Sequence, residues 1–173
     1  MEQSQFRKVH GGSIWRKQQR LIVATVAQSK DSIRELIARF ADAVTRKDLA
    51  SFGILWAEDG EWIIGEPMSL SVVGVDRIEA TFSRIVCKWE FFAQFASSIL
   101  IEISGNHAKA RSTCEEFGIN SRSGETYHNV AVYFDEFILT PEGWRFRKRE
   151  YRYLWLDDRP LSGKTFPVPK LGP

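Results

Sequence analysis

The spacing of hydrophobic residues changes along the chain near residue 90, from a helical period to strict alternation. Before that point, apolar residues recur every three or four positions over residues 33–44, as on the buried face of a helix. Residues 32–35 have the Ser-x-x-Glu form of a capping box, so we expect this helix to begin at Ser32. Asp48 is expected to cap a second, shorter helix, and Gly74 to open a third.

The remaining hydrophobic pattern predicts strands. The Ala-Glu-Asp-Gly sequence at residues 57–60 predicts a turn, followed by a short strand over residues 61–64. Turn residues then separate four long runs of alternating hydrophobicity, which cover residues 91–104, 108–120, 126–139 and 144–155. The order of these elements predicts an α+β fold with a curved antiparallel meander sheet. Because long twisted strands coil, we expect three helices against the concave face to leave a cone-shaped pocket.

The chain has the length of one domain with additional terminal segments. Residues 1–28 mix basic residues, glycines and one short apolar stretch without a sustained period, and are expected to form an N-terminal arm. The domain itself is expected to cover residues 29–157. Four prolines follow, at positions 160, 167, 169 and 173, and they predict an extended C-terminal tail over residues 158–173.

Composition and charge exclude several classes of function. The formal net charge of +2 does not favour a nucleic-acid-binding protein. Cys87 and Cys114 form no Cys-x-x-Cys pair, and no two histidines share a predicted face, so neither a metal site nor another cofactor is expected. No apolar run reaches the roughly 18 residues of a membrane span. The apolar run at residues 21–27 is short and late for a signal peptide, so we expect a cytoplasmic protein.

Strand alternation sorts the run at residues 126–139 into two faces. The face expected to point inward is polar and aromatic, and consists of Tyr127, Asn129, Ala131, Tyr133, Asp135 and Phe137. The other face is mostly apolar, and consists of His128, Val130, Val132, Phe134, Glu136 and Ile138. Leaving such a face in water costs roughly 1.5–3 kcal/mol for each large apolar side chain. The pattern therefore predicts a homodimer that packs through this outer face.

The inward-facing residues supply candidates for chemistry. A carboxyl group in an aromatic cavity has a raised pKa, so Asp135, with Tyr133 beside it, is the best acid or base. The alternative is that Asp135 forms an ion pair with Arg147 or Arg149 on the next strand and stays inert. Tyr127 and Asn129 on the same face are expected to bind substrate.

Two polar residues on the first long strand are further candidates. Gln94 and Ser98 are four residues apart, so they are expected to share a face and could orient a substrate carbonyl. The alternative is that both are ordinary polar groups whose hydrogen bonds are satisfied within the protein.

Three stretches together carry a resemblance to a known family, namely residues 40–62, 94–108 and 133–146. They contain a helix–helix–strand opening, a strand–turn–strand ending in Gly-Asn-His, and a Tyr-x-Asp strand that leads to Gly-Trp-Arg-Phe. In this order the chain resembles the SnoaL-like branch of the nuclear-transport-factor-2-like superfamily over residues 30–157. The resemblance implies a scytalone dehydratase or ketosteroid isomerase type of fold.

The resemblance also implies roles for single residues. Asp42 matches a helix-one aspartate that contacts substrate or water in scytalone-dehydratase-like members, and is a catalytic candidate on that ground. Gln94 stands where those members have a histidine, and Phe40 stands where isomerases have a tyrosine. Phe40, together with Trp62 at the mouth of the pocket, is expected to bind substrate.

Two hypotheses about function follow. In the first, the protein is a cofactor-free enzyme that uses Asp42 and Asp135 for proton transfer on a small hydrophobic ring compound, by dehydration, isomerisation or cyclisation. In the second, it is a non-catalytic ligand-binding protein or accessory subunit, for example of a ring-hydroxylating oxygenase. Two carboxyl groups opening into one cavity would favour the first, and an Asp135 held by Arg147 or Arg149 would disfavour it.

Overall fold

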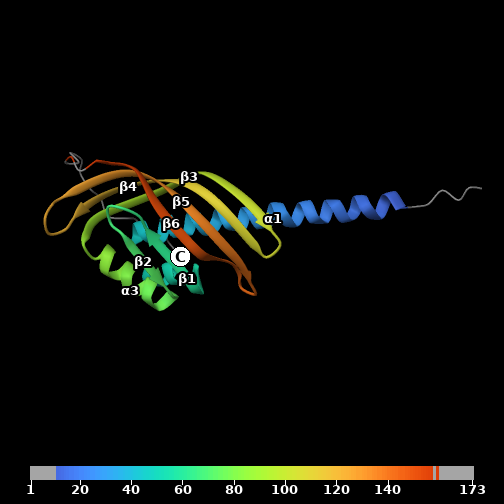
Figure 1. Ribbon diagram of the computed structural model, residues 1–173, viewed down its shortest axis with the longest axis horizontal. Coiled ribbons are helices and arrows are strands. Elements are labelled where there is room, and N and C mark those ends of the chain that lie inside the picture. The colour runs from blue at the N-terminus through green and yellow to red at the C-terminus, as the bar shows by residue number, and fades with distance from the viewer. Residues whose placement is uncertain (1–10, 158, 160–173) are drawn as a thin grey trace, which may run out of the picture.

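The computed structural model of the protein describes residues 11–157 and residue 159 (Figure 1). Three helices and six strands make up this part of the chain. The helices are α1 (Gly11–Arg46), α2 (Leu49–Gly53) and α3 (Val75–Val86). The strands are β1 (Trp56–Ile64), β2 (Leu70–Val73), β3 (Trp89–Ser104), β4 (His107–Asn120), β5 (Thr126–Thr140) and β6 (Gly143–Asp157).

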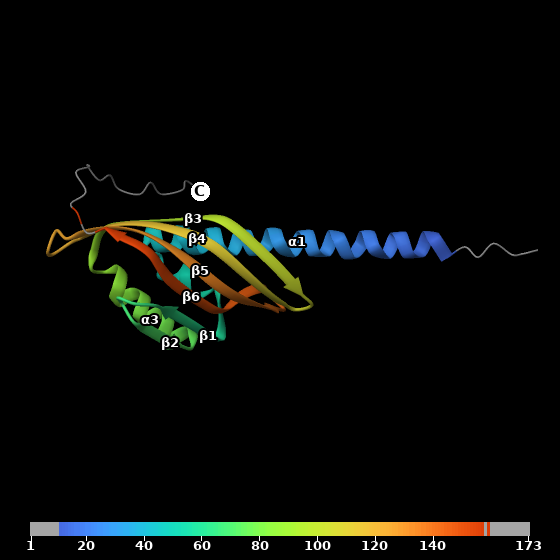
Figure 2. The same ribbon diagram turned by 45° about the horizontal axis from the view of Figure 1, so that its top comes forward.

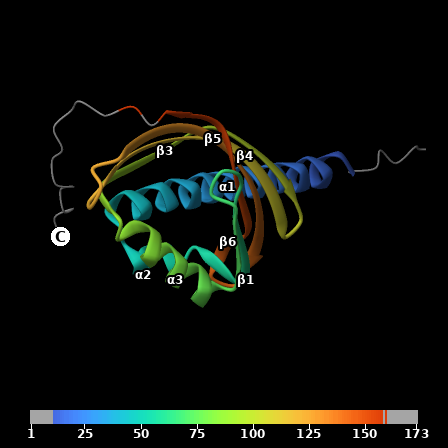
Figure 3. The ribbon, with the colours of Figure 1, turned by 60° about the vertical axis from the view of Figure 1, so that its left-hand side comes forward.

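The strands form one sheet in the order β2-β1-β6-β5-β4-β3. Neighbouring strands are antiparallel except β1 and β6, which are parallel. The four long strands form the predicted meander, and they arch over one side of α1 (Figure 3). The α+β class with a curved sheet is therefore confirmed.

The core lies between the concave face of the sheet and the helices. The second half of α1 contributes the predicted stripe, because Ile33, Ile37, Phe40 and Val44 are all buried. Aromatic rings from other elements pack around Phe40, and they include Phe52, Trp56, Tyr133 and Phe146. Burial of each large apolar side chain stabilises the fold by roughly 1.5–3 kcal/mol.

The expected start of the first helix at Ser32 is wrong. Helix α1 begins at Gly11, and Ser32 lies within it, with its Oγ donating to the carbonyl of Gln28 at 3.0 Å. A serine and a glutamate three residues apart fit a capping box, but they are equally compatible with a helix interior. Residues 11–28 of the expected arm are therefore helical, and the expected domain boundary at residue 28 falls inside α1. The first part of α1 projects beyond the sheet (Figures 1 and 2). The predicted tail at 158–173 lies outside the described residues except for Arg159.

Two expectations about strands also need correction. Residues 57–60, expected to form a turn, belong to β1, whose pairing with β6 shifts register between Trp56 and Glu61. In β3, a bulge between Ser97 and Leu100 places Ser98 at a positive φ of 51°. A bulge inserts an extra residue and reverses the alternation of faces beyond it.

The described residues contain neither a helix suited to span a membrane nor a cluster of metal ligands. None of their helices combines the length and apolar character needed to cross a lipid bilayer. No group of three or more histidine, cysteine, aspartate or glutamate side chains among them is arranged to hold a metal ion.

Candidate functional site

A cavity of about 320 Å³ lies between the concave face of the sheet and helices α1 and α3. This volume is at the lower end of the range found for small-molecule sites. Most of its wall is apolar or aromatic, and includes Phe40, Trp62, Phe82, Trp89 and Phe92. The polar residues of the wall come from the long strands, and are Gln94, Glu116, Tyr127, Tyr133, Tyr151 and Tyr153.

Glu116 is the acidic residue of this wall, and its side chain is held by three hydrogen-bond donors. The strand registers place Glu116 on β4 directly between Gln94 on β3 and Asn129 on β5. The Gln94 amide donates to Oε1 of Glu116. Oε2 accepts from Asn129 Nδ2 at 3.0 Å and from the Tyr151 hydroxyl at 2.8 Å. The Glu116 residue is only 8% exposed, and the orientation of its carboxylate is fixed by groups from three other strands.

The tyrosine hydroxyls near Glu116 are held in their neutral, donating form. Burial, and after it the negative charge of Glu116, raises the pKa of Tyr127 and Tyr151 far above the usual value and that of Tyr153 to about 12. Among the described residues, no side chain hydrogen-bonds to the hydroxyl of Tyr127 or Tyr153. These two hydroxyls can therefore donate to a molecule in the cavity.

Gly118, two residues after Glu116 on the same face of β4, gives the aromatic wall its shape. A Cβ at this position would lie 2.7 Å from the ring of Tyr127 and 3.1 Å from that of Trp89. The rings of Trp89 and Tyr127 pack edge to face with centroids 4.8 Å apart, and Phe92 lies 5.9 Å from both. The absence of a side chain at Gly118 lets this cluster of three rings lie against the strand beside Glu116.

Several residues expected at the site do line the cavity, namely Phe40, Trp62, Gln94, Tyr127 and Tyr133. Asn129 is fully buried and contacts Glu116 and Tyr151, so it lies behind the wall. The expected inward face of β5 is confirmed by the burial of its residues. The functional roles of these residues remain predictions.

Asp135 does not reach the cavity. It lies opposite Arg149 on β6, and Arg149 Nε is 3.4 Å from Asp135 Oδ1, with both side chains almost completely buried. The Arg149 guanidinium packs against the rings of Phe40, Tyr133 and Phe146, with its carbon 3.7–4.5 Å from their centroids. Desolvation, opposed by the charge of Arg149, raises the pKa of Asp135 to about 6. Of the two arrangements considered for Asp135, the structure therefore has the ion pair, with Arg149 as the partner.

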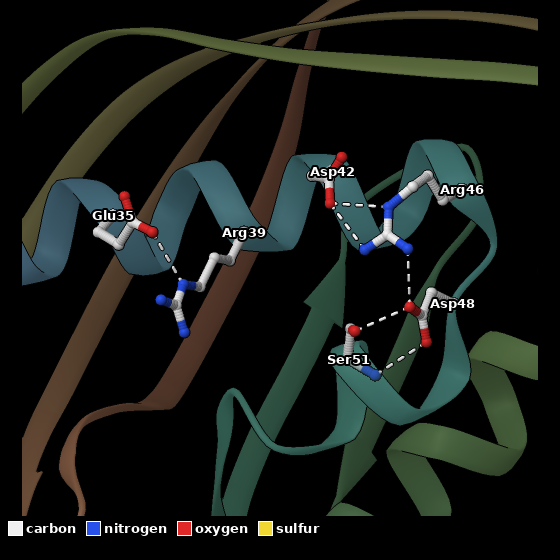
Figure 4. Close-up of polar contacts among 6 residues, drawn as sticks. All are labelled: Glu35, Arg39, Asp42, Arg46, Asp48 and Ser51. Carbon is white, nitrogen blue, oxygen red and sulfur yellow. Dashed lines mark hydrogen bonds and ion pairs between the residues drawn. The ribbon is translucent and has the colours of Figure 1, made fainter. Parts of the chain in front are cut away.

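Asp42 also lies outside the cavity, and Figure 4 shows its side chain directed at that of Arg46, one turn further along α1. Its side chain is 53% exposed and pairs with Arg46 at 2.8 Å. Arg46 also pairs with Asp48 at 2.9 Å, and Asp48 caps α2 as predicted, with Oδ1 accepting from the Ser51 N–H at 3.0 Å. Asp42 is therefore linked through Arg46 to the residue that caps α2, and it stabilises the connection between α1 and α2. It does not share a cavity with Asp135.

Ser98 is separated from Gln94 by the bulge in β3. It is exposed and lies beside Arg111 and Val132 on the convex side of the sheet, whereas Gln94 is buried on the concave side. The expectation that the two residues share a face is wrong, because the bulge breaks the alternation on which it rested.

Sequence reasoning missed Glu116. A signal was present in the alternation of β4, where the concave face carries Ala108, Ala110, Ser112, Cys114, Glu116 and Gly118. A single acidic residue among small, weakly polar ones indicates a carboxylate directed into the interior.

Structures of other proteins share this fold at low sequence identity. A candidate scytalone dehydratase from Novosphingobium aromaticivorans is 18% identical, with a TM-score of 0.73, over 83% of this chain and 99% of the other. A candidate aromatic ring hydroxylase from the same organism is 19% identical, with a TM-score of 0.71, over 76% and 93%. The hexachlorocyclohexane dehydrochlorinase LinA-type3 from Novosphingobium barchaimii is 20% identical, with a TM-score of 0.70, over 83% and 97%.

Sequence comparison gives a family but no characterised relative. The profile of the SnoaL-like domain matches residues 25–150, which include the whole cavity wall except Tyr151, Tyr153 and Leu156. Among curated proteins, none matches the chain significantly.

Proposed function

The chain belongs to the SnoaL-like domain family. On that premise we propose that it binds a small ring compound and catalyses a cofactor-free proton transfer with Glu116 as the base. The observation that supports this most directly is a buried carboxylate in an apolar cavity, beside phenol hydroxyls that can donate to a ligand. Such a combination of base and hydrogen-bond donors suits removal of a proton from a carbon next to a carbonyl group.

The proposed chemistry divides the work between two sets of groups. Glu116 accepts the proton from carbon, and the electron pair of the broken C–H bond moves toward the carbonyl oxygen. The hydroxyls of Tyr127 and Tyr153 donate hydrogen bonds to the oxyanion that develops there. Return of the proton to another carbon gives an isomerisation. Loss of a leaving group from the adjacent carbon gives an elimination, and a hydroxide leaving group that takes up the proton departs as water.

Gln94, Asn129 and Tyr151 act through Glu116 in this proposal. Each donates a hydrogen bond to the carboxylate and limits its rotation. Holding a base in one orientation lowers the entropic cost of reaching the reactive geometry. Two of the similar structures are named for a dehydratase and a dehydrochlorinase, whose reactions are eliminations, and this supports the proposed reaction class.

Hydrogen exchange tests the proposal without knowledge of the natural substrate. Dissolved in D₂O, 2-tetralone takes up deuterium beside its carbonyl when a base removes a proton there, and NMR follows the uptake. We expect the protein to accelerate this exchange, and Glu116→Gln to reduce the acceleration by roughly 10²–10⁴-fold while calorimetry shows unchanged 2-tetralone binding.

Glu115→Gln is the matched control, because Glu115 neighbours Glu116 but pairs with His128 at 2.8 Å on the opposite face. The control should exchange deuterium at the full rate. Exchange by Glu116→Gln at the rate of the unmodified protein would eliminate Glu116 as the base.

A non-catalytic binding role is the second candidate. It is favoured by Gln94, which cannot titrate at a position where related dehydratases carry a histidine, and by the ion pair that holds Asp135 away from the cavity. Binding of 2-tetralone without accelerated exchange, together with no turnover in a panel of cyclic ketones and alcohols, would support this role.

We also propose that two copies of the chain associate through the convex face of the sheet. Phe95, Phe134 and Trp155 are exposed on this face. The same face carries both acidic and basic residues, so two copies related by a two-fold axis can be complementary in charge. These residues include Glu102, Glu115, Glu136, Glu150, Lys109, Arg111, Lys148 and Arg152. Light scattering after size exclusion tests the proposal, and a monomer at micromolar concentration would refute it.

A further inference from the structure

The charges buried inside the protein do not balance around the cavity. Among the side chains whose burial the structure describes, the buried charged residues are Glu116, Asp135 and Arg149. Arg149 pairs with Asp135, outside the cavity. No lysine, arginine or histidine among the described residues forms an ion pair with Glu116 or lines the cavity. The described wall therefore carries one negative charge and no positive one.

A buried carboxylate without a cation is costly, since burial removes its hydration. The three donors around Glu116 are neutral and offset only part of that cost. They are also unevenly distributed, because Oε2 accepts two hydrogen bonds and Oε1 accepts one, from Gln94. An oxygen of a carboxylate can accept two, so Oε1 retains the capacity to accept another from a ligand.

The rings beside Glu116 suit the same kind of ligand. Trp89, Phe92 and Tyr127 line the cavity and contact one another, with centroids 4.8–5.9 Å apart. Phe92 and Tyr127 are both in register with Gly118, which is two residues from Glu116 on the same face. A cation within about 6 Å of such rings is attracted by their negative faces, and the attraction grows when water is excluded.

We propose that the polar end of the cavity binds an organic ammonium ion, carried by a ring compound small enough for the cavity. In this complex the ammonium group donates to Oε1 of Glu116 and lies against Trp89, Phe92 and Tyr127. The ring of the ligand occupies the apolar end near Phe40 and Phe82. The inference shares its cavity with the proposed function, but it concerns equilibrium binding and needs no turnover.

Three probes that share one ring system isolate the effect of charge. They are 2-naphthylmethylamine, which is protonated at neutral pH, the neutral 2-naphthylmethanol, and the anionic 2-naphthoate. Titration calorimetry at pH 7 should show the amine binding at least tenfold more tightly than the alcohol, and no detectable binding of the carboxylate. Equal affinity for the amine and the alcohol would overturn the inference with no variant required.

Glu116→Gln should remove the preference for the amine and leave the affinity for the alcohol unchanged, whereas Glu115→Gln should keep the preference. A preference that persists in Glu116→Gln would also overturn the inference. The two proposals fail separately. If the unmodified protein prefers the amine but does not accelerate deuterium exchange into 2-tetralone, only the catalytic role is refuted. If it accelerates the exchange but does not prefer the amine, only the ammonium site is refuted.

Discussion

Two acidic side chains, Asp135 and Glu116, are buried on the same face of the sheet among the residues whose burial the structure describes, and their surroundings differ in two respects. Asp135 lies across from an arginine, and aromatic rings cover the pair on the cavity side. Glu116 lies between two amide side chains, and it lines the cavity. Both carboxyls are almost fully buried, at 2% and 8% exposure, so burial does not separate them.

Access to the cavity and the balance of charge, rather than a raised pKa, distinguish Glu116 from Asp135. Burial raises the pKa of Asp135 to about 6, a shift often associated with catalysis. No molecule in the cavity can reach this carboxyl, because its side chain is sealed and its charge is matched by Arg149. Glu116 differs in both properties, because it lines the cavity and has no cationic partner among the described residues.

The largest expected effect comes from removing the cation of the sealed pair. Arg149→Met would leave Asp135 buried without a partner and would also remove the guanidinium from the rings around it. We expect the free energy of unfolding to fall by roughly 3–5 kcal/mol, measured by urea denaturation.

Arg147→Met is the matched control for this change, because Arg147 is exposed and lies 4.0 Å from Asp59. It should change stability by less than about 0.5 kcal/mol. Equal losses in the two variants would mean that burial of the Arg149–Asp135 pair has no special energetic consequence.

A smaller effect is expected from titration of Asp135. Its pKa is raised from an ordinary 3.8 to about 6 in the folded protein, so between these pH values the folded state binds a proton that the unfolded state has released. Stability from this group therefore falls as pH rises through this window, by on the order of 2–3 kcal/mol in total.

The difference in unfolding free energy between the unmodified protein and Asp135→Asn, followed from pH 4 to 7, isolates this contribution. The comparison cancels other carboxyls such as Asp157, whose pKa is lowered to about 2 by hydrogen bonds from Arg159. A difference that stays constant over this range, or grows in favour of the unmodified protein with rising pH, would contradict the assignment.

The smallest expected effect concerns the cavity wall beside Glu116. In Gly118→Ala the new methyl group would meet the rings of Tyr127 and Trp89 at 2.7 and 3.1 Å. We expect a loss of roughly 1–2 kcal/mol in stability, as for other overpacked cores, and weaker binding of 2-naphthylmethanol because the rings move into the cavity. Unchanged affinity and stability would show that the rings do not depend on this glycine for their position.

Much of the fold could be predicted from local patterns. The helical stripe of α1, the cap at Asp48, the long alternating strands and the inward face of β5 all follow from residue spacing. The errors fall where a pattern has two meanings. A Ser-x-x-Glu sequence occurs both at helix starts and inside helices, and alternation predicts faces only where no bulge intervenes, as Ser98 shows.

The candidate site was less predictable than the fold. Tyr133, Tyr127, Gln94, Phe40 and Trp62 line the cavity as expected from alternation and family resemblance. Asp42 could be placed on α1, but a position next to a buried stripe does not decide whether a side chain faces a cavity or solvent. Alternation in β4 indicates that Glu116 faces inward, but its meeting with Gln94 depends on which strand lies beside β3 and on the offset between them.

By itself the sequence determined most of the helices and strands and the inward face of β5, because both follow from local periodicity and apolar burial. It also limited the partner of Asp135 to two arginines. Only the tertiary structure decided that Arg149 is that partner and that Glu116 meets Gln94 and Asn129, because strand register and bulges set which residues stand opposite one another. The balance of charge around a cavity depends on such long-range pairings, and no local pattern encodes it.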